Sequence, residues 1–411
     1  MDPRREPCHV VVVGAGPAGA AAAITLARLG LRVAMVDKAT FPRDKCCGDG
    51  LTTAALRRLE SLGLDPADVG SWEPVGDVVV VGSDGRQAEL PLPDDGTQFA
   101  ASARRVDLDA ALVQVAVSSG AALLEGVAVT GVSPAHAGGA IGVNLADGSS
   151  LTCAYLIAAD GAWSPVRKAV GAGTSGYLGD WQAGRQYYAG AGPAAKKLWV
   201  WFEPEMVPGY AWSFPLAGGM VNVGYGVLRD GDGKLGGELK GQQIDFLDRP
   251  HIAAVLGPDA APASGWKAWP IPARIGDAAM SALDGRVLFA GDAARACDPM
   301  TGEGIAQALE TGELAARAVA AAGPRNPAAA ARRYERQVRW GMSLDDKLAR
   351  ALSNVLARRS GSSRALAIAD KSAWSRRNFA RWMFEDYPRA VLATPHRWSS
   401  GMFTRPGAYR A

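Results

Sequence analysis

A glycine-rich turn near the amino terminus constrains this 411-residue chain more than any other feature. The apolar run Cys8–Val13 is typical of a buried parallel strand. It leads into the pattern GxGxxG, formed by Gly14, Gly16 and Gly19, and then into a helix of small residues, Ala18–Leu29. Such glycines allow a tight turn, a close approach of the backbone to a pyrophosphate, and close packing of helix on strand. The segment therefore predicts a dinucleotide-binding βαβ unit.

An acid closes the next predicted strand, Leu31–Val36, at Asp37. A carboxylate at this place accepts hydrogen bonds from ribose hydroxyls and repels a 2′-phosphate, so the site disfavours NADP. The glycine pattern recurs at 171–176, and its alanine variant occurs at 190–195. Neither copy has the strand–turn–helix context, so we interpret both as loops.

Two further acid–glycine pairs each follow a short apolar run. Asp160 and Gly161 come after one predicted strand, and Gly291 and Asp292 come after another. Open α/β sheets bind ligands at the carboxyl ends of their strands, so both pairs are candidate ligand-binding positions.

The second pair continues into the start of a predicted helix, Gly304–Ala321. Pro299, Gly302 and Gly304 lie at that start, where the positive end of the helix dipole suits the electron-rich edge of a flavin ring.

The composition narrows the class of partner. Lys plus Arg number 44 against 41 for Asp plus Glu, so no basic excess points to a nucleic acid. The cysteines form no metal-type spacing, and the four histidines, His9, His136, His251 and His396, fall in no motif. We therefore predict no metal site, and a protein of the reducing cytoplasm.

The order of the predicted strands indicates an α/β fold with an α+β substrate part. We expect a discontinuous Rossmann-like nucleotide-binding domain, an interleaved antiparallel β-sheet substrate domain, and a C-terminal helical region. The expected boundaries are 1–70, 100–178 and 280–325 for the first, 71–99 and 179–279 for the second, and 326–411 for the third.

These motifs resemble the FAD-dependent fold of p-hydroxybenzoate hydroxylase and, within it, the geranylgeranyl reductase family. That family includes digeranylgeranylglycerophospholipid reductases and reductases of the menaquinone side chain. The resemblance covers roughly residues 8–320. It rests on the glycine turn, Phe41–Leu51 (FPRDKCCGDGL), the helix start at Arg105, the two acid–glycine segments and Pro208–Gly226.

The resemblance implies FAD as the cofactor. The residues expected to bind it are Gly14, Gly16, Pro17, Ala18, Gly19, Asp37, Lys38, Cys47, Gly48, Arg105, Val129, Asp160, Gly161, Gly291, Asp292, Pro299, Gly302, Gly304 and Ile305.

Several of these residues take specific roles by the same resemblance. Asp37 would bind the adenosine ribose, and Arg105 would lie near the phosphates or the flavin chain. Asp292 would bind the ribityl or diphosphate part, and the segment 302–305 would line the pyrimidine edge. Cys47 and Gly48 match a Cys-Gly pair beside the flavin, whereas Cys46 departs from the family pattern.

Tyr210, Trp212 and Phe214 alternate along a predicted strand and therefore share one face. Periodicity alone favours an aromatic core face. The resemblance favours a face that lines the substrate instead, because YxWxFP followed by NVGxG is distinctive of the reductases. By that resemblance, these three residues and Cys47 are the substrate-side catalytic candidates. A flavin-dependent halogenase is disfavoured, since no lysine occurs between Lys45 and Lys168.

The expected function is reduction of carbon–carbon double bonds in an isoprenoid or other bulky apolar substrate, by hydride transfer from flavin N5. NAD(P)H or a reduced electron-carrier protein would supply the electrons. A monooxygenase or oxidase of natural-product biosynthesis, and a non-catalytic prenyl-binding protein, remain alternatives.

The tail, with Trp374, Trp382 and Trp398 among many arginines, predicts either a helical cover or a peripheral contact with the inner membrane face. The sequence leaves the oligomeric state open.

Overall fold

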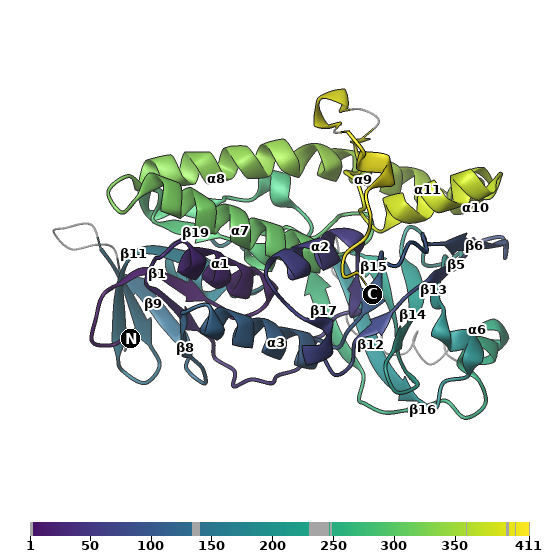
Figure 1. Cartoon of the computed structure of the whole chain (residues 1–411), viewed down its shortest axis with the longest axis horizontal. Helices are drawn as coiled ribbons and strands as arrows, with labels where there is room; N and C mark the ends of the chain where they lie inside the picture. Colours follow the sequence, from purple (N-terminus) through teal and green to yellow (C-terminus); the bar gives the residue numbers. More distant parts are fainter. Residues whose placement is uncertain are drawn as a thin grey trace.

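Two eight-stranded sheets lie side by side along the long axis of the protein (Figure 1). They are seen in a computed structural model that describes residues 3–133, 140–229, 246, 249–358, 360–391, 394–398 and 400–410. The first sheet follows the order β18-β19-β11-β1-β2-β8, and β9 and β10 extend it from β11. Its strands are β1 (Cys8–Val13), β2 (Val33–Val36), β8 (Ala122–Leu124), β9 (Val129–Ser133), β10 (Ile141–Leu145), β11 (Ser150–Ala158), β18 (Ser281–Ala282) and β19 (Val287–Phe289).

The centre of this sheet is parallel. Val13 of β1 is in register with Ala158 of β11 on one side and with Val36 of β2 on the other. All three strands end at the same edge, directly before the glycine turn, Asp160 and Asp37. Because helices cover a parallel sheet on both faces, its strands read as continuous apolar runs, which is why the sequence predicted them.

The second sheet is antiparallel except for the parallel pair β13 and β5. It follows the order β16-β12-β15-β14-β13-β5-β6, and β17 pairs with β12. Its strands are β5 (Asp77–Val81), β6 (Gln87–Pro91), β12 (Trp181–Ala189), β13 (Leu198–Trp201), β14 (Tyr210–Leu216), β15 (Met220–Leu228), β16 (Ala261–Pro262) and β17 (Lys267–Ile271). A small third sheet contains β3 (Gly50–Leu51), β4 (Glu73–Pro74) and β7 (Ala101–Ser102).

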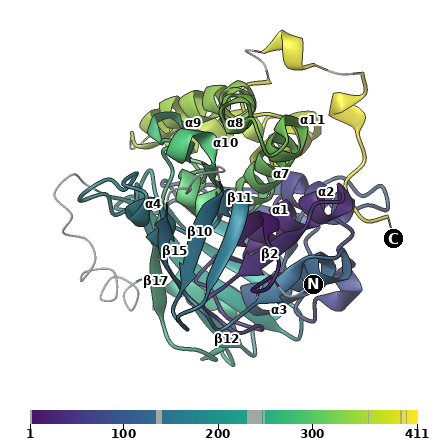
Figure 2. The same cartoon turned by 90° about the vertical axis from the view of Figure 1, so that its left-hand side faces the viewer.

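Helices from the C-terminal third of the chain run along one side of the molecule and extend over both sheets (Figures 1 and 2). The α-helices are α1 (Pro17–Arg28), α2 (Thr53–Ser61), α3 (Arg105–Ser118), α4 (Pro165–Ala169), α6 (Pro250–Leu256), α7 (Ile305–Ala322), α8 (Pro327–Gly341), α9 (Ser343–Leu356), α10 (Gly361–Ala369) and α11 (Ala373–Met383). Short 3-10 helices are η1 (Pro66–Asp68), η2 (Pro193–Lys196), η3 (Ile275–Asp277), η4 (Leu283–Gly285), η5 (Gly291–Ala294), η7 (Pro395–Arg397) and η8 (Met402–Thr404).

Helix α1 packs against α3 and very closely against α7. A Cβ atom added to Gly312 of α7 would lie 2.1 Å from the backbone oxygen of Ala18, so the two backbones touch where the helices cross. Among the described residues, no helix is long and apolar enough to cross a membrane.

The predicted α/β fold class is confirmed. The second strand begins at Val33 rather than Leu31, and the glycine-rich segment 171–176 contains no helix or strand. The segment 190–195 runs into η2 rather than into a phosphate-binding helix. Both repeats lack a parallel strand before them, which is why they form loops.

Candidate functional site

The glycine turn between β1 and α1 accepts no side chain at two positions. Gly14 has a φ of +93°, and a Cβ atom there would lie 2.3 Å from the backbone oxygen of Ala159. A Cβ atom at Gly19 would lie 1.7 Å from the backbone oxygen of Gly14. The start of α1 is therefore pressed against the end of the sheet, with its free N–H groups at the turn.

Asp37 spans this turn from the end of β2. Its Oδ2 accepts the backbone N–H of Ala15 at 2.8 Å, and its Oδ1 accepts that of Ala39 at 2.9 Å. The carboxylate is thus oriented before any ligand arrives.

A cavity of about 540 Å³ opens beside the turn. The predicted residues that line it are Gly14, Gly16, Asp37, Lys38, Val129, Asp160 and Gly161. Trp163 and Trp269 also line it, and their rings meet edge to face with centroids 6.4 Å apart. These two tryptophans were not predicted from the sequence, because Trp163 lies in a turn and Trp269 is a single aromatic residue in the short strand β17, so neither belongs to a periodic pattern.

Two guanidinium groups lie against the turn at Gly16. A Cβ atom built on Gly16 would lie 3.4 Å from Nη2 of Arg43 and 3.7 Å from Nη2 of Arg105. Asp109 binds both groups. Its Oδ1 and Oδ2 accept from Nε and Nη2 of Arg105, each at 2.7 Å. Its Oδ2 also accepts from Nη1 of Arg43 at 2.7 Å. Two positive groups at a helix N-terminus suit a diphosphate.

Arg43 and Asp109 were not predicted from the sequence, although Arg43 lies in the segment Phe41–Leu51 and Asp109 lies one helical turn after Arg105. Burial would raise the pKa of Asp109, but the adjacent Arg105 and Arg43 hold that pKa below its usual range. The spacing of Arg105 and Asp109 on one face of a helix was the available signal.

A second cavity, of about 130 Å³, continues from the first, since Lys45, Cys46 and Trp269 line both. The predicted residues around it are Cys47, Gly48, Arg105, Tyr210, Trp212, Phe214, Asp292, Gly302, Gly304 and Ile305. Lys45 donates to Oδ2 of Asp292 at 3.0 Å. Burial opposes the charge of Asp292, but Lys45 lowers its pKa below the usual value.

The loop after Cys47 is fastened to the aromatic strand β14 through Asn222 of β15. The Asn222 amide donates to the backbone oxygen of Cys47 at 2.9 Å and to Oδ2 of Asp49 at 2.8 Å. Its own oxygen accepts from Nε1 of Trp212 at 3.0 Å, and Tyr187 donates to Asp49 at 2.7 Å. Asp49 and Asn222 were not identified from the sequence, because their roles depend on a contact between distant segments.

Burial controls the ionisation of this loop. It raises the pKa of the Cys47 thiol to about 11 and that of the Cys46 thiol to about 12, so both are neutral near pH 7. Burial also raises the pKa of Asp49 to about 6. The thiol of Cys46 donates to the backbone oxygen of Lys267 at 3.3 Å.

A third, apolar cavity of about 250 Å³ adjoins the second, with Gly50, Tyr210, Phe214, Thr301 and Glu303 lining both. Its remaining walls come from strands of the second sheet and from the C-terminal helices. They include Val80, Leu198, Val200, Phe202, Leu352, Leu356, Leu366, Phe379, Met383 and Phe384. The three predicted aromatic side chains share a face, and successive ring centroids along β14 are 5.9 Å apart.

Five predicted residues lie behind these walls rather than along the first two cavities. They are Pro17, Ala18, Gly19, Gly291 and Pro299. A Cβ atom at Gly291 would lie 3.0 Å from that of Ala18, and the Pro299 oxygen accepts from Nε1 of Trp181 at 3.0 Å. In the described part of the chain, no three His, Cys, Asp or Glu side chains group as metal ligands would.

The protein is an FAD-dependent oxidoreductase, and its fold and the three connected cavities agree with this class. A family model described as "FAD binding domain" matches residues 7–185. A menaquinone reductase of Mycolicibacterium smegmatis is 36% identical over 328 residues, which cover 76% of each chain. A digeranylgeranylglycerophospholipid reductase of Methanosarcina mazei is 29% identical, covering 76% of this chain and 75% of the relative.

The fold agrees with these sequence relationships. A crystal structure of a geranylgeranyl bacteriochlorophyll reductase-like protein from Thermoplasma acidophilum superposes with a TM-score of 0.76 at 21% identity, covering 95% of this chain and 99% of the other. The chain belongs to the geranylgeranyl reductase family of FAD-dependent oxidoreductases.

Asp37→Ala is expected to weaken FAD binding by about 10- to 100-fold, because a charge-assisted hydrogen bond contributes roughly 1.5–3 kcal/mol. Titration of the cofactor-free protein with FAD, followed by flavin fluorescence, measures the change. Asp147→Ala, which removes an exposed acid paired with Arg4, serves as the control. Equal affinities of the two variants would contradict the role of Asp37.

Proposed function

We propose that this protein reduces carbon–carbon double bonds in the isoprenoid chain of a lipid-like substrate. The observation that carries the proposal is the apolar cavity that adjoins the second cavity at Tyr210 and Phe214. An isoprenoid chain has no polar atoms, so it is held by apolar area and shape, which these walls offer. FAD, when bound and reduced, supplies a hydride from N5.

In this proposal the residues predicted from the sequence bind FAD along the first two cavities, from Asp37 to the segment 302–305. The cradle suits that group, since Gly14 and Gly19 leave room for backbone contact with a diphosphate and Arg43 and Arg105 offer positive charge. Cys47, held by Asn222, would border the ring. The names of the two relatives, which refer to menaquinone and to a geranylgeranyl lipid, support an isoprenoid substrate.

The side chains of β14 would orient the substrate and exclude water. The Tyr210 hydroxyl donates to the backbone oxygen of Thr301, which fixes the phenol between the two cavities. Trp212 is fixed by Asn222, so the aromatic face is rigid before the substrate enters. NAD(P)H or a reduced electron-carrier protein would supply the electrons.

An anaerobic single turnover tests the proposal. FAD-loaded protein is reduced with dithionite and mixed with a short-chain menaquinone, while flavin absorbance and the mass of the product are followed. The expected result is reoxidation of the flavin and a product that gains two hydrogens in its side chain. A reaction that needs oxygen and adds an oxygen atom would identify a monooxygenase instead, and binding without turnover would identify a carrier.

Val200→Trp is expected to slow turnover by roughly 10- to 100-fold, because the indole fills the apolar cavity and displaces the reacting bond. Val200 lies on β13, away from the glycine turn, so FAD affinity should not change. Steady-state rates with menaquinones of several chain lengths provide the measurement. Val200→Leu, a smaller change at the same position, should lose activity only with the menaquinones that have longer side chains. Equal rates with all menaquinones in both variants would place the substrate elsewhere.

A further inference from the structure

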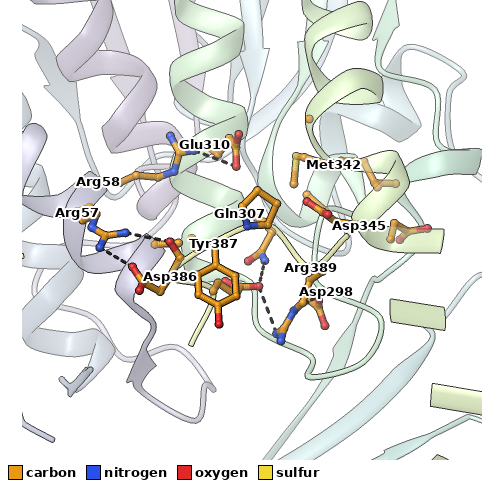
Figure 3. Close-up of a pocket in the computed structure, with 18 of the residues that line it drawn as sticks. Arg57, Arg58, Asp298, Gln307, Glu310, Met342, Asp345, Asp386, Tyr387 and Arg389 are labelled. Atoms are coloured by element: carbon orange, nitrogen blue, oxygen red, sulfur yellow. Dashed lines mark hydrogen bonds and ion pairs between the residues drawn. The ribbon is translucent and has the colours of Figure 1, made fainter. Parts of the chain in front are cut away.

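A polar cavity of about 500 Å³ lies between α2, α7, α9 and the segment after α11. Most of its charged groups are paired across it: Figure 3 shows Arg57 directed at Asp386 and Arg58 at Glu310, the latter pair 3.0 Å apart. The cavity reaches the surface at Arg405, which is exposed. A charged cavity of this size holds water.

Glu385 connects this polar cavity with the apolar one. Its Oε1 accepts from the Gln307 amide at 2.8 Å. Its Oε2 accepts from the hydroxyl of Thr52 at 3.2 Å, and Thr52 lines the apolar cavity. Arg389 is buried and forms an ion pair with Glu385, in which its Nη2 lies 3.6 Å from Oε1.

The backbone of Glu385 is strained. Its φ is +55°, in the left-handed region that favours glycine, just past the end of α11. The N–H of Asp386 returns to the oxygen of Arg381 at 3.0 Å, as at helix ends that glycine usually closes. A glutamate at such a position costs stability, as strained residues at functional sites often do.

Glu303 is a second acid at the apolar cavity. It precedes α7 and lines both the second and the apolar cavity, and its Oε1 accepts the backbone N–H of Ile305 at 2.8 Å. Cys47 and Tyr210 line the second cavity together with Glu303, and the charge of Glu303 contributes to their raised pKa values.

Burial raises the pKa of Glu303 to about 7 and that of Glu385 to about 8, and the charge of Glu303 contributes to the second shift. Protonated carboxyl groups are therefore present near neutral pH. The titratable and charged groups around the pair are Cys47, Tyr210, Cys297, Asp298 and Arg389.

We propose that Glu303 is the general acid of the reduction and that Glu385 passes it protons from the polar cavity. This inference rests on the proposed function. One carbon of the double bond accepts the hydride from reduced FAD, so the substrate gains two electrons and the flavin loses them. The other carbon takes the proton of Glu303 with the π electron pair, and Glu303 regains a proton from Glu385, which cavity water reprotonates.

The first test uses the reduced holoenzyme and a short-chain menaquinone without oxygen. Flavin reoxidation by the wild-type protein should slow as the pH rises through about 7, because only protonated Glu303 donates. Glu303→Gln should slow it by roughly 10²- to 10⁴-fold and abolish this pH dependence, measured with both proteins saturated with FAD. A wild-type rate and pH profile in Glu303→Gln would overturn the proposal.

A second readout needs neither flavin nor substrate. Infrared spectroscopy of the cofactor-free protein should show a carboxyl carbonyl band that disappears as the pH rises through about 7 and is missing in Glu303→Gln. An unchanged band in that variant would overturn the assignment of the acid. Failure of the wild-type protein to reduce any isoprenoid probe would instead overturn the proposed function, so the two failures are distinguishable.

Glu385→Gly tests the relay without straining the fold, since glycine prefers the backbone conformation found there. Glycine relieves the backbone, but the change also removes the ion pair with buried Arg389, so the urea midpoint is measured to verify that the variant is folded. Flavin reoxidation by the folded variant should slow by about tenfold or more, and Glu385→Asp should restore part of the rate. Glu313→Gln is the matched control, because Glu313 is a buried acid of α7 paired with Arg58 and Arg317 that lines none of these cavities. Equal loss in the control, or none in Glu385→Gly, would overturn the relay.

Discussion

Gly19→Ala is expected to yield a colourless protein whose free energy of unfolding is lower by about 3 kcal/mol or more. The added methyl group would lie 1.7 Å from the backbone oxygen of Gly14, so α1 must move away from the end of β1. Overpacking of this kind costs roughly 1–3 kcal/mol where side chains can adjust, and here the methyl group meets a backbone oxygen, which cannot rotate away. The same movement carries the N–H groups of α1 away from the position where a diphosphate would meet them.

Urea unfolding and the ratio of flavin to protein absorbance measure the two parts of this effect. Gly341→Ala is the control, since Gly341 is also a helical glycine but has only a distant contact, 3.9 Å from the Glu310 carboxylate. That control should be neutral or slightly stabilising, because alanine favours helix by about 1 kcal/mol. If Gly19→Ala behaved like Gly341→Ala, the close packing of α1 on β1 would be wrong.

Arg105→Leu should lower the stability by about 3–5 kcal/mol and reduce FAD binding strongly. Asp109 is fully buried, and the change removes its bidentate partner, which leaves Arg43 as its remaining hydrogen-bonded cation. Breaking a buried ion pair on one side costs about this much because a desolvated charge loses compensation, and Arg43 alone replaces only part of it. One of the two positive groups beside Gly16 is lost at the same time.

The double variant Arg105→Leu with Asp109→Leu separates the two consequences. Replacing both members of a buried pair by apolar groups is often neutral, so urea unfolding should show that most of the stability returns. FAD binding should stay weak, because the positive charge is still absent and Arg43 has lost its anchor. Recovery of FAD affinity together with stability would show that Arg105 acts through folding alone.

The parts of the site that were predictable come from single segments. Gly14, Gly19 and Asp37 lie within one βαβ unit, where backbone geometry dictates the residue types, so the sequence pattern carries the information. The alternation of Tyr210, Trp212 and Phe214 likewise predicts a shared face, and the structure shows one. Whether that face meets a core or a cavity is not encoded in its periodicity.

The residues that were missed depend on segments brought together from far apart. Asp49 meets Asn222 and Tyr187 from the second sheet, and Glu385 meets Thr52 across most of the length of the chain. Glu303 stood next to the predicted Gly302 and Gly304 but had no pattern of its own. Its raised pKa results from burial between two cavities, which no local pattern reveals.

The amino-acid order alone was enough to establish the nucleotide-binding half, because glycine turns and apolar strands are local consequences of backbone sterics and hydrogen bonding. The apolar cavity and the environment of Glu303 and Glu385 arise only when the C-terminal helices cover the second sheet. The hydrogen bonds that hold the Cys47 loop arise only when that loop meets β12 and β15. Burial and electrostatic environment are properties of packed neighbours, and they change the chemistry of a side chain without changing its letter.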